Sequence, residues 1–229
     1  MGMSKNTPLD LRTLGFVLRR TNYGEADRII SIITPKGKIS AIARGVRKNK
    51  SKLAGGIEPF SKIDFNIHSG KSELAVVTGA KMLKYYGEIL KDFDRMELAG
   101  KILKAVNKYS ENSDNPAFFD IVEQCLEGLD DKMDTRLVDG WFYLNLRKAM
   151  GEELNFYRDS NGARLEESKK YTWDNLGEEF VEKANGDYGV NEIKLLRVLS
   201  TMKLKMIAKI RIDEETLKKS IELVRVVRS

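Results

Sequence analysis

The sequence contains a single cysteine, Cys125, and a single histidine, His68, in 229 residues. One cysteine excludes an intrachain disulfide and a four-cysteine zinc site. One histidine excludes multi-histidine metal sites and any Ser/His/Asp triad that does not use His68. We therefore expect no catalytic residue, no metal and no cofactor. Cys125 is expected to be buried on an apolar helical stripe, and His68 to lie at a surface turn.

Long apolar runs are also missing. The first residues contain no apolar stretch of signal-peptide length, and no later run approaches the ~20 apolar residues that a membrane span needs. We therefore expect a cytoplasmic protein that does not bind membranes.

Acidic residues are scarce at both ends of the chain. The formal net charge is +6, but residues 1–83 carry +9, residues 84–193 carry −9 and residues 194–229 carry +6. This asymmetry predicts a polyanion contact built from the two basic ends. The alternative interpretation is that the charges only solvate helix faces.

Alternation of apolar and polar residues predicts five short strands near the N-terminus. The expected strands cover residues 11–20, 27–34, 37–44, 60–68 and 73–81. Five short strands joined by tight turns and one long loop are typical of a small barrel of the oligonucleotide-binding (OB) type.

From Tyr85 onward the hydrophobic period changes from two to about 3.6, which predicts helices. The expected helices begin at Asp94, after Asn115-Pro116, at Asp134 or Thr135, at residue 191 and after Asp213. The fold class is therefore α+β, with an OB-fold domain at residues 1–83 and an all-helical domain at residues 84–229. An irregular insertion is expected at about residues 152–190, with a short extended piece at 170–173 and helical turns at 178–184.

The loop after the third strand is strongly basic. Between residues 44 and 52 it contains no acidic residue and these basic ones: Arg44, Arg47, Lys48, Lys50 and Lys52. A mobile cationic loop between two strands suits a polyanion, because phosphate neutralisation depends little on sequence. The alternative is a solvated hairpin loop.

Several short motifs within residues 13–81 occur in an order that resembles the N-terminal domain of the bacterial RecO recombination-repair proteins. The motifs are Gly24-Glu25, Asp27-Arg28-Ile29, Thr34, Gly37-Lys38, Ala43-Arg44-Gly45, Arg47-Lys48, Ser51-Lys52-Leu53 and Glu58-Pro59-Phe60. The helical remainder agrees with this family in length and order.

The resemblance implies a function in DNA repair and homologous recombination without catalysis. It implies binding of single- and double-stranded DNA, annealing of complementary strands, and binding of the C-terminal tail of the single-stranded DNA-binding protein. It also implies cooperation with RecR to load RecA. Many members of the family carry a four-cysteine zinc module in the helical part, where residues 152–190 of this chain contain no cysteine.

A cationic groove with aromatic faces is what holds a single strand, because bases stack on aromatic rings. The candidate DNA-binding residues are Arg19, Arg20, Arg28, Lys38, Arg44, Arg47, Lys48, Lys50, Lys52 and Tyr23. Arg28 has an alternative role as the ion-pair partner of Asp27 or Glu25. Phe16, Phe60 and Phe65 are weaker stacking candidates, because they alternate like core residues.

A second site is predicted near the C-terminus, where cations alternate with apolar residues. Its candidate partner-binding residues are Lys203, Lys205, Met206, Lys209 and Arg211. An apolar pocket rimmed by cations suits an acidic, hydrophobic C-terminal peptide. The alternative is that these lysines are the solvated face of an amphipathic helix.

Two other classes of function compete with the DNA-repair interpretation. An OB-fold RNA-binding module of translation or ribosome assembly would prefer RNA and would not stimulate annealing. An enzyme would show nuclease or ATPase activity as a pure protein, although no paired-carboxylate motif supports one.

Overall fold

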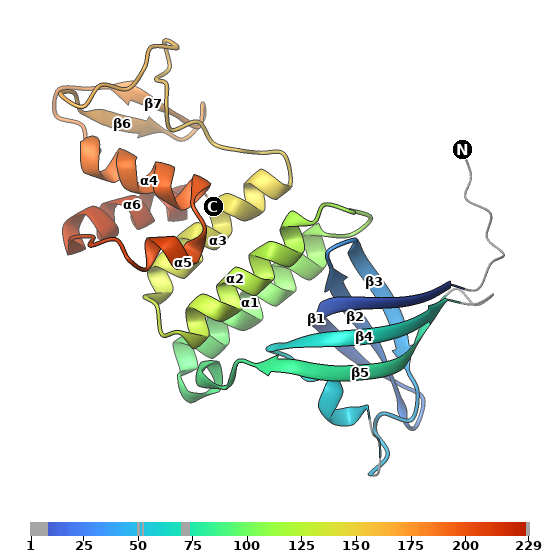
Figure 1. The fold of residues 1–229 in the computed structure, drawn as a ribbon. Coiled ribbons are helices and arrows are strands. Elements are labelled where there is room, and N and C mark those ends of the chain that lie inside the picture. The colour runs from blue at the N-terminus through green and yellow to red at the C-terminus, as the bar shows by residue number, and fades with distance from the viewer. Residues whose placement is uncertain (1–8, 50, 52, 70–73, 228–229) are drawn as a thin grey trace, which may run out of the picture. The chain divides into compact units, whose positions relative to one another are not determined.

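The structure is a computed structural model and describes residues 9–49, 51, 53–69 and 74–227. Contacts divide the chain into two compact units, Met1–Asp130 and Asp131–Ser229. The first unit contains a β-barrel and two long helices, and the second contains four helices and a small sheet (Figure 1).

Five strands of the first unit form a closed barrel in the order β1-β2-β3-β5-β4. They are β1 (Leu9–Tyr23), β2 (Asp27–Thr34), β3 (Gly37–Ala43), β4 (Ser61–Ser69) and β5 (Ala75–Tyr85). All neighbouring strands are antiparallel except β3 and β5, and β4 closes the barrel against β1. This is the strand order of an OB fold, so the predicted barrel and the α+β class are confirmed.

A β-bulge between Val17 and Arg19 divides β1 into two parts. Val17 lies in the barrel core, and Arg19 pairs with Ser31 on the opposite face of the sheet. The remaining core residues alternate along the strands as a half-buried sheet requires. They include Ile30, Ile32, Ala41, Ala43, Ile63, Phe65, Ile67 and Val77.

Two helices of the first unit pack against the barrel, α1 (Phe93–Tyr109) and α2 (Ala117–Asp130), after a short 3₁₀ turn, η2 (Gly87–Lys91). The ring of Phe16 on β1 lies 5.2 Å from that of Phe119 on α2. The β2–β3 turn lies beside the α1–α2 loop (Figure 1), where a Cβ on Gly37 would come within 2.6 Å of the carbonyl oxygen of Ser113. The sequence pattern places a domain boundary near residue 83, where strands give way to helices. In the structure, α1 and α2 lie beyond that position but contact the barrel.

The helix starts agree with the expected capping residues except in one case. Asn115 Oδ1 accepts a hydrogen bond from the backbone N–H of Ala117, and Asp134 and Asp213 cap the helices that begin at Thr135 and Glu214. The cap of the first helix lies two residues earlier than expected, because Asp92 rather than Asp94 accepts the N–H of Arg95. Asp94 lies in the first turn, where a carboxylate is also favourable.

The second unit is built from α3 (Thr135–Ala149), α4 (Val190–Thr201), α5 (Leu204–Ile207) and α6 (Glu214–Val226). The helical period of the sequence runs from residue 191 to Lys209, whereas in the structure α4 ends at Thr201 and α5 begins at Leu204. Met202 takes an extended conformation, and its carbonyl accepts a hydrogen bond of 2.8 Å from Trp141 Nε1 on α3. This tertiary contact favours the break over helix continuation.

The insertion contains a two-stranded sheet, β6 (Tyr171–Asp174) and β7 (Glu179–Glu182). The predicted extended piece is confirmed by β6, but the helical turns expected at 178–184 are wrong. Aromatic side chains decide the outcome, because Trp173 and Phe180 occupy paired positions of the two strands with ring centroids 5.0 Å apart. Cross-strand aromatic pairs stabilise a hairpin, and here they outweigh the helical propensity of a short segment.

Phe180 is the centre of an aromatic cluster in the insertion. Its ring centroid lies 5.0 to 6.2 Å from those of Phe156, Tyr171, Trp173 and Tyr188. Residues 152–190 do not fit the zinc module of the wider family, because the chain's one cysteine, Cys125, is buried in α2. In the part of the chain that the structure describes, no group of three or more potential ligands is suited to a metal ion.

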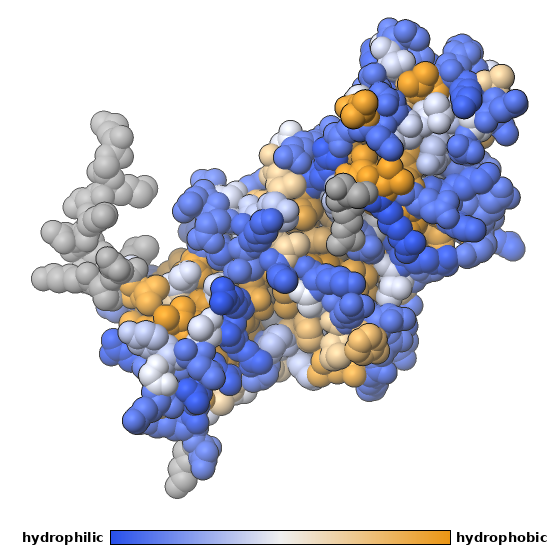
Figure 2. All heavy atoms as spheres, turned by 180° about the vertical axis from the view of Figure 1, so that it is seen from behind, coloured by the Kyte–Doolittle hydropathy of each residue, from blue (hydrophilic) through white to orange (hydrophobic). Residues whose placement is uncertain are grey.

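The surface drawn in Figure 2 is mostly hydrophilic, with apolar side chains in separate patches. Large exposed apolar side chains include Leu90 and Phe93 in the first unit and Leu176 at the tip of the β6–β7 hairpin. None of the described helices has the length and apolar character that a membrane span requires.

Candidate nucleic-acid interface

The outer face of strands β1, β2 and β3 presents three cross-strand rows of side chains. Residues at paired positions share a face of the sheet. The pairings of β1 with β2 and of β2 with β3 give the rows Arg19–Ser31–Ser40 and Thr21–Ile29–Ile42, and then the pair Tyr23–Asp27. Neighbouring residues in the chain, such as Ile30, Ala41 and Ala43, point into the core. We call these outward side chains, with Arg44 directly after β3, the outer face.

The basic loop begins at one end of the outer face and is fastened there. The backbone N–H of Gly45 donates a 2.7 Å hydrogen bond to Asp27 Oδ1, and the N–H of Arg47 donates to the carbonyl of Ala26 at 2.9 Å. Gly45 has a φ of +62°, which a glycine adopts without strain. The start of the loop, at Gly45 and Arg47, is therefore hydrogen-bonded to the β1–β2 turn and the first residue of β2.

Several cations of the outer face and of the loop that follows it remain available to a ligand. Arg19, Arg44 and Lys48 are exposed and make no side-chain hydrogen bond or ion pair with the described residues. Arg47 is also exposed and uses one guanidinium nitrogen to reach the carbonyl of Gly24 at 3.2 Å. Charged side chains without a protein partner are free to neutralise phosphate groups.

Three of the predicted DNA-binding residues are engaged elsewhere in the first unit. Arg20 pairs with Ile30 on the inner side of the sheet and forms a 3.0 Å ion pair with Glu58. Arg28 pairs with Ala43 on the same side and donates to Asn22 Oδ1 at 3.2 Å. Among the described residues, no ion pair joins Arg28 to Asp27 or Glu25, and Asp27 accepts the backbone N–H of Gly45 instead.

Lys38 points outward but is committed to α1. Its side chain is only 8% exposed, forms an ion pair with Glu111 and donates a 2.8 Å hydrogen bond to the carbonyl of Asn107. Lys38 therefore fastens the barrel to the end of α1. Lys50 and Lys52 lie outside the described residues.

Tyr23 is the aromatic residue of the outer face, and its side chain is 54% exposed at the end of β1. Phe16 and Phe65 are buried, as their strand periodicity indicates, and are not available for stacking. Phe60 is partly buried and has a φ of +55° just before β4.

Sequence reasoning missed the uncharged members of the outer face. Thr21, Ile29, Ser31 and Ser40 lie between the cations and Tyr23 in the strand register, and Ile42 pairs with Ile29. The sequence feature that could have identified them is the two-residue period of each strand, because every one of these residues alternates with a core residue. Small polar and half-buried apolar side chains of this kind let bases and sugars approach the sheet.

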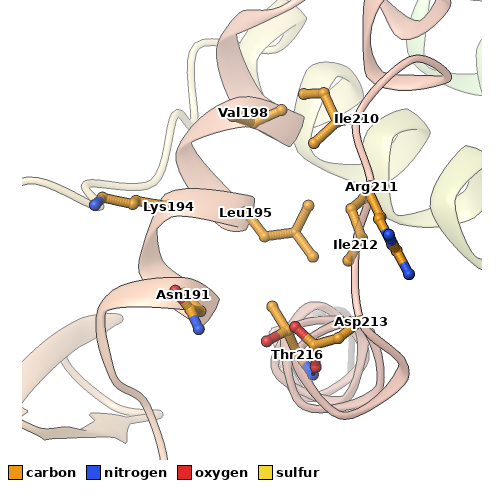
Figure 3. Close-up of a pocket in the computed structure, with 9 residues that line it drawn as sticks. All are labelled: Asn191, Lys194, Leu195, Val198, Ile210, Arg211, Ile212, Asp213 and Thr216. Atoms are coloured by element: carbon orange, nitrogen blue, oxygen red, sulfur yellow. Dashed lines mark hydrogen bonds between the residues drawn. The ribbon is translucent and has the colours of Figure 1, made fainter.

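The second predicted site lies around α5 and the segment that leads to α6. Lys203, Lys205, Met206, Lys209 and Arg211 are all exposed there. Arg211 lines a pocket of about 330 Å³ formed by α4, the residues before α6 and the first turn of α6. Leu195 and Ile212 face each other across this pocket, whereas Lys194 and Arg211 extend away from its centre (Figure 3).

The rim of this pocket is mixed in charge. Backbone and side-chain hydrogen bonds from Thr216 hold the pKa of Asp213 below its usual range, so this carboxylate stays ionised beside Arg211. Lys194 is paired with Glu167 at 2.7 Å. The four apolar lining residues are Leu195, Val198, Ile210 and Ile212. The pocket is therefore an apolar depression with Arg211 on its rim, and this guanidinium forms no ion pair with the described residues.

Comparison with known proteins agrees with this architecture. Two family models match the chain, recombination protein O N terminal at residues 9–86 and recombination protein O C terminal at residues 90–228. The DNA repair protein RecO of Dehalococcoides mccartyi strain 195 is 29% identical over 218 residues, which cover 92% of this chain and 86% of that protein. The DNA repair protein RecO of Alkaliphilus metalliredigens is 36% identical over 118 residues, 51% of this chain and 48% of its own length.

The first match lies on the barrel with its outer face, and the second covers α1 to α6. Together they leave few residues of the chain unmatched. From the barrel topology, the helical remainder and these matches, we conclude that the chain belongs to the RecO family of DNA repair proteins.

Proposed function

We propose that the protein is a mediator of DNA repair and homologous recombination that binds single- and double-stranded DNA on the outer face and anneals complementary strands. The observation that carries the proposal is the combination of unpaired cations with the exposed ring of Tyr23 at one end of the barrel. Cations that track a backbone, together with an aromatic ring that stacks a base, are the requirements for binding a single strand.

Annealing on such a surface needs no covalent chemistry. Complementary strands repel each other through their phosphates, and the basic residues of the outer face and of the loop neutralise part of that charge. Binding also raises the local concentration of the strands, so that base pairing follows by mass action. We therefore propose an action in the cytoplasm without a catalytic residue or cofactor.

Replacement of Tyr23 by alanine is expected to weaken single-stranded DNA binding by about 1 to 3 kcal/mol, the usual contribution of one stacked base. Tyr23→Trp is the matched control, because an indole ring keeps the stacking surface. Fluorescence anisotropy with a labelled oligonucleotide measures both affinities. Equal affinities of the wild type and Tyr23→Ala would show that this ring does not contact a base.

The proposed partners follow from the same family assignment. We propose that the protein works with RecR and with the single-stranded DNA-binding protein to help load RecA. The C-terminal tail of the single-stranded DNA-binding protein is acidic and hydrophobic, and the pocket offers an apolar floor with the guanidinium of Arg211 on its rim. The exposed lysines around α5 add positive charge outside the pocket.

An annealing assay tests the proposed function. Two complementary labelled strands are mixed with the full chain, and resonance energy transfer reports the rate of pairing. The proposal predicts faster pairing than in protein-free buffer and an acceleration that declines as salt rises. Binding of structured RNA in preference to DNA, with no faster pairing, would favour the RNA-binding module instead.

A further inference from the structure

Helix α1 carries a basic face that the outer face does not include. Lys104 and Lys108 are exposed on it, and neither forms an ion pair within the part of the chain that the structure describes. Other lysines near this helix are neutralised, since Lys101 pairs with Glu97 at 3.1 Å and Lys91 pairs with Glu88. The Lys108 ammonium donates a 3.4 Å hydrogen bond to the Tyr109 hydroxyl and lies 4.8 Å from the centroid of that ring, contacts that leave its charge in place. Lys104 and Lys108, one turn apart, therefore keep the positive charge that an ion pair would cancel.

The basic face of α1 adjoins the outer face at Lys38. Asn107, whose backbone carbonyl accepts from Lys38, lies three residues after Lys104 in the last turn of α1, and Glu111, the ion-pair partner of Lys38, follows the end of the helix. The α1–α2 loop beyond them lies beside the β2–β3 turn (Figure 1). The ion pair with Lys38 also neutralises Glu111, which would otherwise repel a phosphate at the junction.

The number of residues along β3 gives the distance that a bound single strand covers between the loop and Lys38. Arg44 and Lys38 are six residues apart along β3 and its end, which corresponds to about 20 Å at about 3.3 Å per residue. Ser40 and Ile42 lie outward between them. A short oligonucleotide covers this distance, whereas a longer one extends past Lys38 and reaches the next turn of α1.

We propose that the nucleic-acid site continues from the outer face across the Lys38–Glu111 pair onto α1, where Lys104 and Lys108 contact the phosphates of the same single strand. The inference rests on the proposed function and extends its binding site. It assigns to α1 the phosphates at one end of a long oligonucleotide, while the loop at residues 44–49 holds the other end.

Dependence on oligonucleotide length tests the proposal. Affinities of the wild type and of Lys104→Ala/Lys108→Ala are measured by anisotropy across a salt series, with oligothymidylates of about 4 and about 16 nucleotides, the range of OB-fold site sizes. Loss of two phosphate contacts lowers the slope of log affinity against log salt by about 1.4 for a single strand. We expect this reduction with the long oligonucleotide and no reduction with the short one.

Two controls separate the contact from other effects. Lys91→Ala/Lys218→Ala removes the same charge from the far end of η2 and from α6, and should leave both slopes unchanged. Lys104→Arg/Lys108→Arg keeps the charge and should restore the wild-type slope. Equal slopes for the wild type and Lys104→Ala/Lys108→Ala on the long oligonucleotide overturn the proposal. Equal reductions on both lengths overturn it as well.

Failure of the proposed function would look different. If the wild type binds neither oligonucleotide, no DNA site exists on the barrel and the extension fails with it. If the wild type binds the short oligonucleotide and the α1 variant changes nothing, the barrel site stands and only the extension fails.

Discussion

Reversal of Arg44, Arg47 and Lys48 to glutamate is expected to lower the affinity for single-stranded DNA by at least about 100-fold at low salt. Each residue is exposed at the end of the barrel where the loop is fastened. Loss of three charged contacts, at about 1 kcal/mol or more each, accounts for this factor, and repulsion by the new carboxylates adds to it. Anisotropy titrations of the full chain measure the change.

A matched control reverses three exposed lysines of the second unit, Lys170, Lys183 and Lys218. The change in net charge is identical, so any general electrostatic effect on association is included. The account predicts that this control retains most of the affinity. Similar losses in the two triple variants would mean that binding responds to total charge and that the outer face is not the site.

Replacement of Phe180 by alanine is expected to lower the free energy of unfolding of the second unit by about 3 to 5 kcal/mol, as for other buried phenylalanines. Phe180 is fully buried and contacts four other aromatic rings, so its removal leaves a cavity in a small insertion. Denaturant unfolding followed by tryptophan fluorescence reports the change, because Trp173 stacks edge-on against Phe180.

Leu176→Ala is the control for this prediction. Leu176 belongs to the same hairpin but is 97% exposed, so truncation should change stability by less than about 0.5 kcal/mol. Addition of a metal chelator should leave the wild-type unfolding curve in place, because residues 152–190 contain no cysteine that could bind zinc. A Phe180→Ala curve that coincides with that of Leu176→Ala would contradict the assigned role of the cluster.

Much of the barrel follows from local patterning. The strand at residues 27–34 is predicted and observed with identical ends, because β-branched residues and the flanking turns both define it. The helix caps at Asp134 and Asp213 are likewise local, since each carboxylate accepts an N–H from two or three residues later. Such signals lie within a few residues of the element that they specify.

The candidate site was less predictable, because its composition depends on partners far apart in the sequence. Arg20 is occupied by Glu58 and Lys38 by Glu111, 38 and 73 residues away. No local pattern distinguishes these cations from Arg19 and Arg44. The bulge in β1 is a second reason why the site was hard to predict. It interrupts the inward–outward alternation of side chains between Val17 and Arg19. Before the bulge, the ring of Phe16 packs against that of Phe119.

The break after α4 has the same explanation. The pattern of lysines and apolar residues over 191–209 is compatible with one helix, and only the hydrogen bond from Trp141 to the carbonyl of Met202 favours an end at Thr201. Tertiary contacts of this kind override helix propensity, which is a weak preference.

Photochemical crosslinking of single-stranded DNA to the full chain is the measurement that tests the central claim most directly. An oligonucleotide that contains iododeoxyuridine is irradiated with the protein, and the crosslinked peptides are identified by mass spectrometry. The account predicts crosslinks in the peptides that contain Tyr23 and residues 44–49, and their loss in the Arg44→Glu/Arg47→Glu/Lys48→Glu variant. Crosslinks confined to residues 131–229 would contradict the account and place the DNA site in the second unit.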